Sequence, residues 1–254
     1  AFDKAGVKYE YHKGYKENQI AADKTLIDEA VKRAEKYDTV LAFIGLTDYI
    51  ESEGCDRENM CLPENQLALV DSLIKTGKKV VVVLYGGSPV ELPFAEKVAA
   101  ILNMYLPGQC GGEATRKLLF GEKNPCGKLA ETWVKSYSDV PYGDKFSKTK
   151  IEVYKESVFV GYRYYQKAKK TVAFPFGFGL SYTTFDYSDM EIEENGGEIT
   201  VKATVTNTGD RYGAEIVELY VKAPETDVYK PEKELRGFTK VYLDAGKQIR
   251  PRIL

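Results

Sequence analysis

The sequence predicts an α/β domain with a mostly parallel sheet flanked by helices, followed by an incomplete β-sandwich. Up to about residue 180, short apolar runs typical of buried parallel strands alternate with segments of helical periodicity. From Tyr187 onward the hydrophobic period changes to two, as in half-exposed antiparallel strands. About four or five strands fit between that point and Leu254, whereas a complete two-sheet sandwich needs about seven.

Three segments of the first part predict helices. Residues 25–36 place apolar side chains at helical spacing, and the Thr25 hydroxyl is suited to cap the first turn. Residues 64–75 show the same spacing on one face. A third helix is expected to open at Gly111-Gly112 and to stop at Gly121.

Strands are predicted before and between these helices, because their apolar runs are continuous, as in sheets buried on both faces. They cover residues 7–11, 39–44, 79–84, 98–104 and 128–134. The segment from Lys135 to Leu180 lacks periodicity. Such a length is uncommon in a compact domain unless it is functional or covers another domain.

The second part begins with alternating segments. Residues 199–205 and 216–221 lie on either side of a turn at 207–210, and we expect them to be antiparallel neighbours. The change of period places the domain boundary between residues 184 and 185. The two predicted domains are therefore 1–184 and 185–254.

An acidic loop follows the strand at 39–44. Its charged residues fall within eleven positions and are Asp48, Glu51, Glu53, Asp56, Arg57 and Glu58. Open α/β sheets carry their chemistry on loops at the carboxyl ends of strands. Because like charges raise one another's pKa, such a loop suits a proton donor. A cation site and a solvated surface turn are the alternatives, and composition alone favours the surface turn.

Sequence motifs favour the proton donor over the cation site and the surface turn. Residues 51–66, ESEGCDRENMCLPENQ, resemble the acid/base loop of glycoside hydrolase family 3, the β-glucosidase family. Four further segments follow in that family's order: YGGSPVELPF, ILNMYLPGQCGGEATRKLLFGEKNPCGKLAETW, ESVFVGYRYY and FPFGFGLSYTTF. VTNTGDRYGAEIVELYVKAP and KELRGFTKVYLDAG resemble its fibronectin type III-like domain. The resemblance covers nearly the whole chain and implies that family's C-terminal α/β domain at 1–184 and a truncated fibronectin type III-like domain at 185–254.

The resemblance also assigns site residues. Retaining glycosidases use two carboxyl groups, one as acid/base and one as nucleophile. The family's acid/base is the Glu directly before Gly, which implies Glu53, whereas Glu51 is a rival two residues earlier. Glu51 could instead orient the loop or contact substrate. Asp56 and Arg57 are expected to support the loop as a bidentate pair, and a plain surface ion pair is the alternative.

Composition argues against nucleic-acid-binding, membrane-spanning and metal-binding proteins. A net charge of −2 gives no basic field for nucleic acid or an anionic membrane, and we expect neither as a partner. No apolar stretch is long enough to span a bilayer. The four cysteines form no C-x-x-C pair, and with one His we expect no metal and no cofactor. We expect reduced thiols and a cytoplasmic location, with secretion as the alternative.

The family's nucleophile, an Asp, belongs to a (β/α)8 barrel, which needs about 250 residues by itself. The resemblance therefore implies the C-terminal portion of a retaining β-glycosidase, foremost a β-glucosidase acting on terminal non-reducing β-D-glucosyl residues, with β-xylosides or a mixed specificity as alternatives. Such a chain carries the acid/base without the nucleophile and is expected to be inactive alone. We expect its partners to be a β-glucoside or related oligosaccharide and the missing barrel, and its exposed interface to self-associate. The alternative is a non-catalytic carbohydrate-binding or protein-interaction module.

Overall fold

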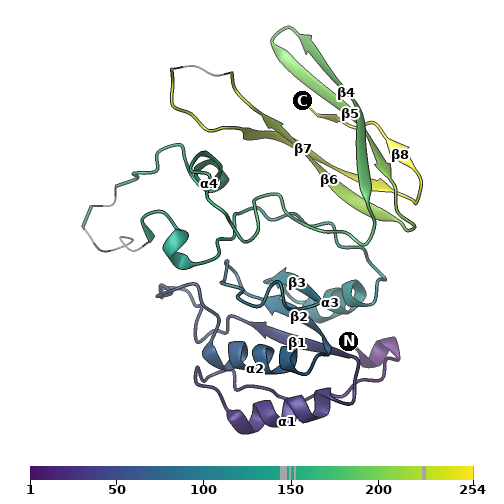
Figure 1. The fold of residues 1–254 in the computed structure, drawn as a ribbon. Helices are drawn as coiled ribbons and strands as arrows, with labels where there is room; N and C mark the ends of the chain where they lie inside the picture. Colours follow the sequence, from purple (N-terminus) through teal and green to yellow (C-terminus); the bar gives the residue numbers. More distant parts are fainter. Residues whose placement is uncertain (144–147, 149, 152, 225–226, 254) are drawn as a thin grey trace. The chain divides into compact units, whose positions relative to one another are not determined.

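The computed structural model describes residues 1–254 apart from 144–147, 149, 152, 225–226 and 254. The chain forms two compact units, coloured along the sequence in Figure 1. The first comprises Ala1–Arg116 and Val134–Gly143, and the second comprises Lys117–Trp133 and the described part of Asp144–Leu254. The boundary predicted between residues 184 and 185 lies inside the second unit and stays a prediction.

The first unit is built on a parallel sheet in the order β1-β2-β3, which confirms the predicted α/β class. The strands are β1 (Thr39–Gly45), β2 (Lys79–Tyr85) and β3 (Ala100–Tyr105). Val82, Val83 and Leu84 are buried in succession, because β2 is the central strand and both of its faces are covered.

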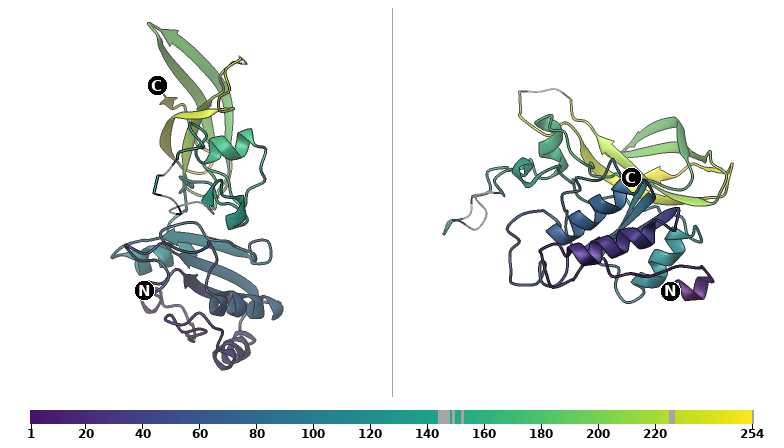
Figure 2. Two further views of the ribbon diagram at one scale, coloured as in Figure 1. Left: turned by 90° about the vertical axis from the view of Figure 1, so that its left-hand side faces the viewer. Right: turned by 60° about the horizontal axis from the view of Figure 1, so that its bottom comes forward.

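Helices cover this sheet as the periodicity predicts. α2 (Glu64–Lys75) connects β1 to β2 and packs on both strands, and α1 (Lys24–Ala34) packs against α2 on the same side of the sheet (Figures 1 and 2). On the other face, the Tyr85 hydroxyl lies 2.7 Å from Thr115 Oγ1 of α3 (Gly111–Leu119). A short 3-10 helix, η1 (Asp3–Ala5), opens the chain.

A buried amide joins the end of β1 to the start of α2. Gln66 is 1 % exposed, accepts a hydrogen bond from Gly45 N and donates one to Gly45 O, each at 2.8 Å. Only glycine fits at position 45, because a Cβ there would lie 1.9 Å from Tyr85 O. The pair therefore fixes the point at which the chain leaves the sheet and enters the acidic loop.

Two details of the first helix and strand differ from the sequence prediction. Asp23 rather than Thr25 caps α1, since Asp23 Oδ1 accepts the Leu26 amide at 3.2 Å. Residues 7–11, all of them described, form no strand. They are held by side chains instead: Glu10 pairs with Arg33 and accepts the Tyr37 hydroxyl at 3.1 Å.

The strand predicted at 128–134 is also absent from the described structure, apart from one isolated bridge between Trp133 and Phe174. Trp133 N donates to Phe174 O at 2.9 Å, and Leu129 N donates to Phe178 O at 2.9 Å. Between these bonds stands Pro175, which has no N–H to continue a ladder.

The segment predicted to lack periodicity is mostly irregular. It contains the 3-10 helix η2 (Tyr137–Asp139) and the short helix α4 (Tyr162–Lys167). Within the second unit, the buried Tyr162 accepts the Leu235 amide at 2.8 Å through its hydroxyl. Positions 144–147, 149 and 152 of this segment lie outside the described residues.

The strands of the second unit form two antiparallel sheets, in agreement with the predicted sandwich. One contains β4 (Phe185–Asn195), β5 (Glu198–Asn207), β8 (Gln248–Ile249) and β9 (Arg252–Ile253), and the other pairs β6 (Gly213–Val221) with β7 (Glu234–Leu243). The core between them consists of Val205, Val217, Val241, Leu243 and Ile253. Among the described residues, no helix is long and apolar enough to cross a membrane.

The predicted pairing of residues 199–205 with 216–221 is wrong, because these segments, β5 and β6, belong to different sheets. Asn207, 0 % exposed, turns the chain between them. It accepts the Thr183 hydroxyl at 2.6 Å and donates to Arg211 O at 2.8 Å and Leu243 O at 3.0 Å. This buried amide stabilises an arch from one sheet to the other instead of a hairpin.

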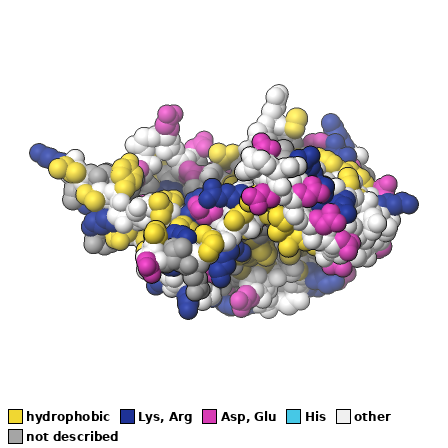
Figure 3. Space-filling model, turned by 90° about the horizontal axis from the view of Figure 1, so that it is seen from above, with side chains coloured by type: hydrophobic (Ala, Val, Ile, Leu, Met, Phe, Trp, Pro, Cys, Tyr) yellow, Lys and Arg dark blue, Asp and Glu magenta, His cyan; other side chains and the backbone are white. Residues whose placement is uncertain are grey.

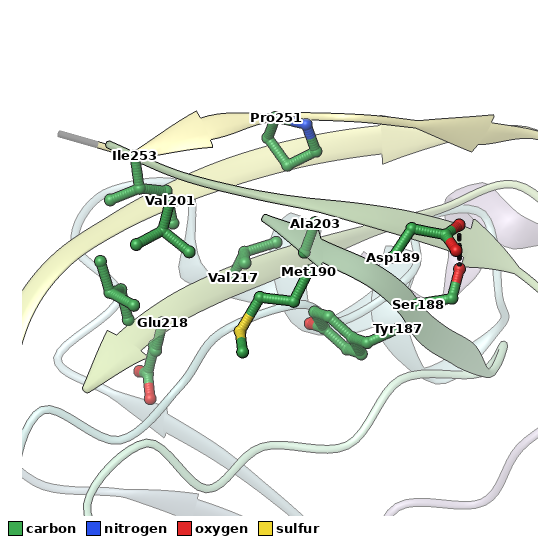
Figure 4. Close-up of a pocket in the computed structure, with 11 residues that line it drawn as sticks. Tyr187, Ser188, Asp189, Met190, Val201, Ala203, Val217, Glu218, Pro251 and Ile253 are labelled. Atoms are coloured by element: carbon green, nitrogen blue, oxygen red, sulfur yellow. Dashed lines mark hydrogen bonds between the residues drawn. The ribbon is translucent and has the colours of Figure 1, made fainter. Parts of the chain in front are cut away.

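A cavity of about 410 Å³ lies between the two sheets (Figure 4). Apolar side chains of β5 and β6, including Val201, Ala203 and Val217, point toward it, and Met190 of β4 lies beside them. The space between the sheets is thus incompletely filled.

Replacing the buried amide at residue 66 tests its role in the first unit. We expect Gln66→Ala to lower the free energy of unfolding by about 2–6 kcal/mol, because the buried N–H and C=O of Gly45 each lose a partner at about 1–3 kcal/mol. Urea unfolding followed by circular dichroism measures this. Gln109→Ala, at an exposed position, is the matched control and should stay within about 0.5 kcal/mol. Equal stabilities of the two variants would contradict the assignment.

Candidate active site

The acidic loop leaves β1 beside the loop that follows β2, because the two strands are parallel neighbours. Leu46 N donates to Tyr85 O at 2.9 Å and continues the pairing by one residue. The Thr47 carbonyl then accepts the amides of Ile50 and Glu51 at 2.8 and 2.9 Å. The first part of the loop is therefore a tight turn that starts from a fixed strand end.

Glu53 stands at the tip of the loop. A turn over Ser52–Cys55 is closed by Cys55 N donating to Ser52 O at 3.4 Å. Gly54 occupies its third position with φ +79°, the conformation that a type II turn requires there and that favours glycine. Glu53 precedes it, is exposed and has no hydrogen bond or ion pair with any residue that the structure describes. Its carboxylate is free to meet a partner from outside the chain.

Glu51 is held in place. Its carboxylate accepts a hydrogen bond from Gly87 N at 2.7 Å and a short one from the Ser88 hydroxyl. Gly87 leaves room for this contact, since a Cβ there would lie 3.3 Å from Glu51 Oε2. The two acids that the sequence left as rivals are therefore in different environments, one anchored to the neighbouring loop and one unpartnered.

Arg57 anchors the other end of the turn. Its Nη1 donates to Ser88 Oγ at 2.7 Å and to Pro89 O at 3.3 Å. Burial lowers the pKa of Arg57, and the nearby Glu51 carboxylate opposes that effect. The expected pair with Asp56 does not form: Asp56 is exposed, and no described residue forms an ion pair or hydrogen bond with it.

Glu91 fixes the exit of the loop. Its backbone N–H donates to Met60 O at 2.8 Å, and its carboxylate accepts the Tyr137 amide at 2.7 Å. The pKa of the neighbouring Cys61 thiol is raised by burial first and by Glu91 second. The loop is thus bound at its start, on both sides of the turn and at its end, whereas Glu53 at the tip has no hydrogen bond or ion pair with the described residues.

This arrangement suits proton transfer to or from a molecule docked against the tip. It does not resemble a cation site: within the described part of the chain, no group of three or more His, Cys, Asp or Glu side chains could hold a metal ion. The carboxylates are instead spread along the loop, and of Glu51, Glu53 and Asp56 only Glu51 has a hydrogen-bond partner among the described residues.

Sequence reasoning missed the two residues that organise the loop, Gly87 and Ser88. Their signal was present in YGGSP, which directly follows a predicted parallel strand next to β1. Loops at the carboxyl ends of adjacent parallel strands meet, so these residues could have been assigned to the site.

Comparisons with known proteins agree with the fold and with the family resemblance of the sequence. The model of the glycosyl hydrolase family 3 C-terminal domain matches residues 5–182. The model of the fibronectin type III-like domain matches residues 215–253. Together these two matches cover most of both units.

Similar proteins are considerably longer than this chain. Thermostable beta-glucosidase B of Acetivibrio thermocellus is 45% identical over 243 residues, which are 94% of this chain and 32% of that protein. An exo-alpha-(1->6)-L-arabinopyranosidase of Bifidobacterium longum is 41% identical over 95% of this chain and 32% of its own length. The crystal structure of a Bifidobacterium adolescentis GH3 beta-glucosidase superposes with a TM-score of 0.94 at 40% identity, covering 99% of this chain and 38% of that one. The chain thus spans about a third of the length of these relatives.

The left-handed position at the tip gives a test of the turn. We expect Gly54→Ala to lower the free energy of unfolding by about 1–2 kcal/mol, because a side chain is strained at this φ although the space around it is open. Gly112→Ala, in α3, is the matched control and should leave stability equal or raise it by up to about 1 kcal/mol. Gly54→Asn should cost less than Gly54→Ala, since Asn tolerates this conformation. An Ala at 54 that costs nothing in urea unfolding would mean that the turn is not formed in solution.

Proposed function

Since this chain belongs to glycosyl hydrolase family 3, we propose that it is the C-terminal part of a retaining β-glycosidase and that Glu53 is the general acid/base. The observation that carries the proposal is the contrast within the loop: Glu53 is exposed and has no partner in the described part of the chain, at a turn whose two sides are anchored through Glu51 and Arg57. A carboxyl group that must protonate a substrate oxygen needs a fixed position and no competing partner.

In the proposed reaction Glu53 first gives its proton to the oxygen of the leaving group while a second carboxylate attacks the anomeric carbon. Glu53 then takes a proton from the water that hydrolyses the glycosyl-enzyme. The second carboxylate is supplied by the barrel that the family resemblance implies. Glu51 and Arg57 support the loop, and we assign Asp56, exposed beside the turn, to substrate binding or loop support.

We propose terminal non-reducing β-D-glucosyl residues as the substrate group, on the strength of the β-glucosidases among the relatives. A relative at 41% identity is named as an arabinopyranosidase, so the C-terminal part is compatible with more than one sugar. We therefore assign the contacts that select the sugar mainly to the barrel.

A barrel would also cover apolar surface. In the second unit, Tyr154 is 82% exposed, and other exposed apolar side chains of the same unit are Ile151, Val153, Val158, Val160 and Tyr229. Figure 3 shows hydrophobic side chains at the surface between acidic and basic ones. We propose that the barrel covers part of this surface in the complete enzyme and that the chain alone self-associates through it.

The isolated chain should hydrolyse an aryl β-glucoside no faster than buffer, because it carries one carboxylate of a two-carboxylate mechanism. The measurement is release of the aryl alcohol by a pure sample, with the Glu53→Ala variant as the blank. Turnover by the wild-type chain that Glu53→Ala abolishes would place a nucleophile within these 254 residues.

The role of Glu53 is tested in a chimera in which this chain replaces the matching C-terminal part of the Acetivibrio thermocellus relative. Glu53→Ala should lower turnover of an unactivated disaccharide by about 10²–10⁴-fold, the usual contribution of a general acid. A dinitrophenyl glycoside, whose leaving group needs little protonation, should still form the glycosyl-enzyme. Added azide should restore turnover, because it attacks that intermediate without help from a base.

Glu51→Ala is the matched control in the same chimera. It leaves the Glu53 carboxylate in place, and we therefore expect no azide rescue. If azide rescues Glu51→Ala and not Glu53→Ala, the two roles are exchanged. If it rescues neither, the acid/base lies outside this loop.

A further inference from the structure

The turn that carries Glu53 depends on contacts made by its neighbours. Glu53 itself has no partner within the described structure, so its position is set by residues 51 and 57 on either side of the Ser52–Cys55 turn. Both of these residues reach the same side chain, Ser88, in the loop after β2.

The Ser88 hydroxyl uses both of its hydrogen-bonding capacities. It donates its proton to Glu51 Oε1 and accepts the Arg57 Nη1–H at 2.7 Å. A hydroxyl group has one donor and can accept at the same time, so it can join an acceptor-only carboxylate to a donor-only guanidinium. One oxygen atom therefore ties together the two ends of the segment that bears the proposed acid/base.

Ser88 is itself firmly placed. Gly86 N donates to Tyr105 O at 3.2 Å, which fixes the start of its loop against the end of β3. Pro89, which follows Ser88, has a fixed φ and also accepts Arg57 through its carbonyl. The adjacent Gly87 N–H adds the second contact to Glu51. Ser88 thus belongs to the loop at the carboxyl end of β2 and not to the acidic loop that it holds.

We propose that Ser88 is a positioning residue for the acid/base Glu53. The inference rests on the proposed function and extends it to a residue in a different loop, which acts through Glu51 and Arg57. Among the described residues, loss of the hydroxyl leaves Glu51 with one hydrogen bond, from the Gly87 amide, and Arg57 with one, to the Pro89 carbonyl. The turn between them therefore gains freedom, and Glu53 spends less time in the productive position.

Ser88→Ala is tested in the chimera described above, with Ser72→Ala as the matched control. Ser72 is also partly buried, and its hydroxyl donates to Ala68 O within α2, away from the loop. We expect Ser88→Ala to lower turnover of the unactivated disaccharide by about 10- to 10²-fold, as small misplacements of catalytic groups do, with a smaller effect on the dinitrophenyl glycoside. No azide rescue is expected, because the Glu53 carboxylate remains. Ser88→Thr, which keeps the hydroxyl, should recover most of the loss.

A second measurement uses the chain by itself. Hydrogen–deuterium exchange of the amides at residues 51–58 should be faster in Ser88→Ala than in wild type and in Ser72→Ala, whereas exchange in β1 and β2 should be unchanged. Faster exchange throughout the first unit would indicate a merely structural role and would overturn the inference.

The kinetic outcomes separate this inference from the function on which it rests. If Glu53→Ala behaves as an acid/base variant while Ser88→Ala affects both substrates equally or not at all, only the positioning role is overturned. If Glu53→Ala shows no leaving-group dependence, the proposed function and the positioning role are overturned together.

Discussion

The first unit depends on the buried amide of Gln66, which forms two hydrogen bonds with the backbone of Gly45. The last residue of a strand has backbone groups that the ladder no longer satisfies, and burying them unpaired costs about 1–3 kcal/mol each. One amide side chain supplies both partners, and only glycine at 45 allows the approach of Tyr85 O. The start of the acidic loop is therefore determined by packing between a strand and a helix, before any charged residue of the loop contributes.

Beyond this fixed start, neutral hydrogen-bond donors and the guanidinium of Arg57 hold the charged loop. Backbone N–H and hydroxyl groups satisfy Glu51, and Arg57 lies close enough for its charge to matter. The carboxylate of Glu53 at the tip is left without a partner among the residues that the structure describes. An ion pair at residue 53 would fix the side chain more firmly but would compete with a substrate oxygen for it.

The sequence predicted the parts of this structure that local pattern determines. The span of α2 and the continuous burial of β2 follow from periodicity. The sequence-based predictions were wrong where tertiary contacts determine the secondary structure. Residues 7–11 have strand-like composition and no strand to pair with, Pro175 interrupts the partner of 128–134, and Asn207 turns a predicted hairpin into an arch.

In the candidate site, too, local sequence identified the loop, whereas its tertiary contacts became visible only in the structure. The resemblance singled out the segment and its acids, but not the anchor, because Ser88 is remote in sequence and has an ordinary side chain. Its role becomes visible only when two parallel strands place their carboxyl ends side by side. Likewise, Arg57 was expected to bind its neighbour Asp56, and its actual partners come from residues 88 and 89.

The position of the single tryptophan of the chain determines what its fluorescence can report. Trp133 is 2 % exposed, belongs to the second unit and packs edge-on against Phe174, with ring centroids 6.5 Å apart. Intrinsic tryptophan fluorescence therefore reports on the surroundings of this one bridge in the second unit. An emission spectrum that stays native is evidence about those surroundings only. The state of the acidic loop has to be followed by a probe placed in the first unit.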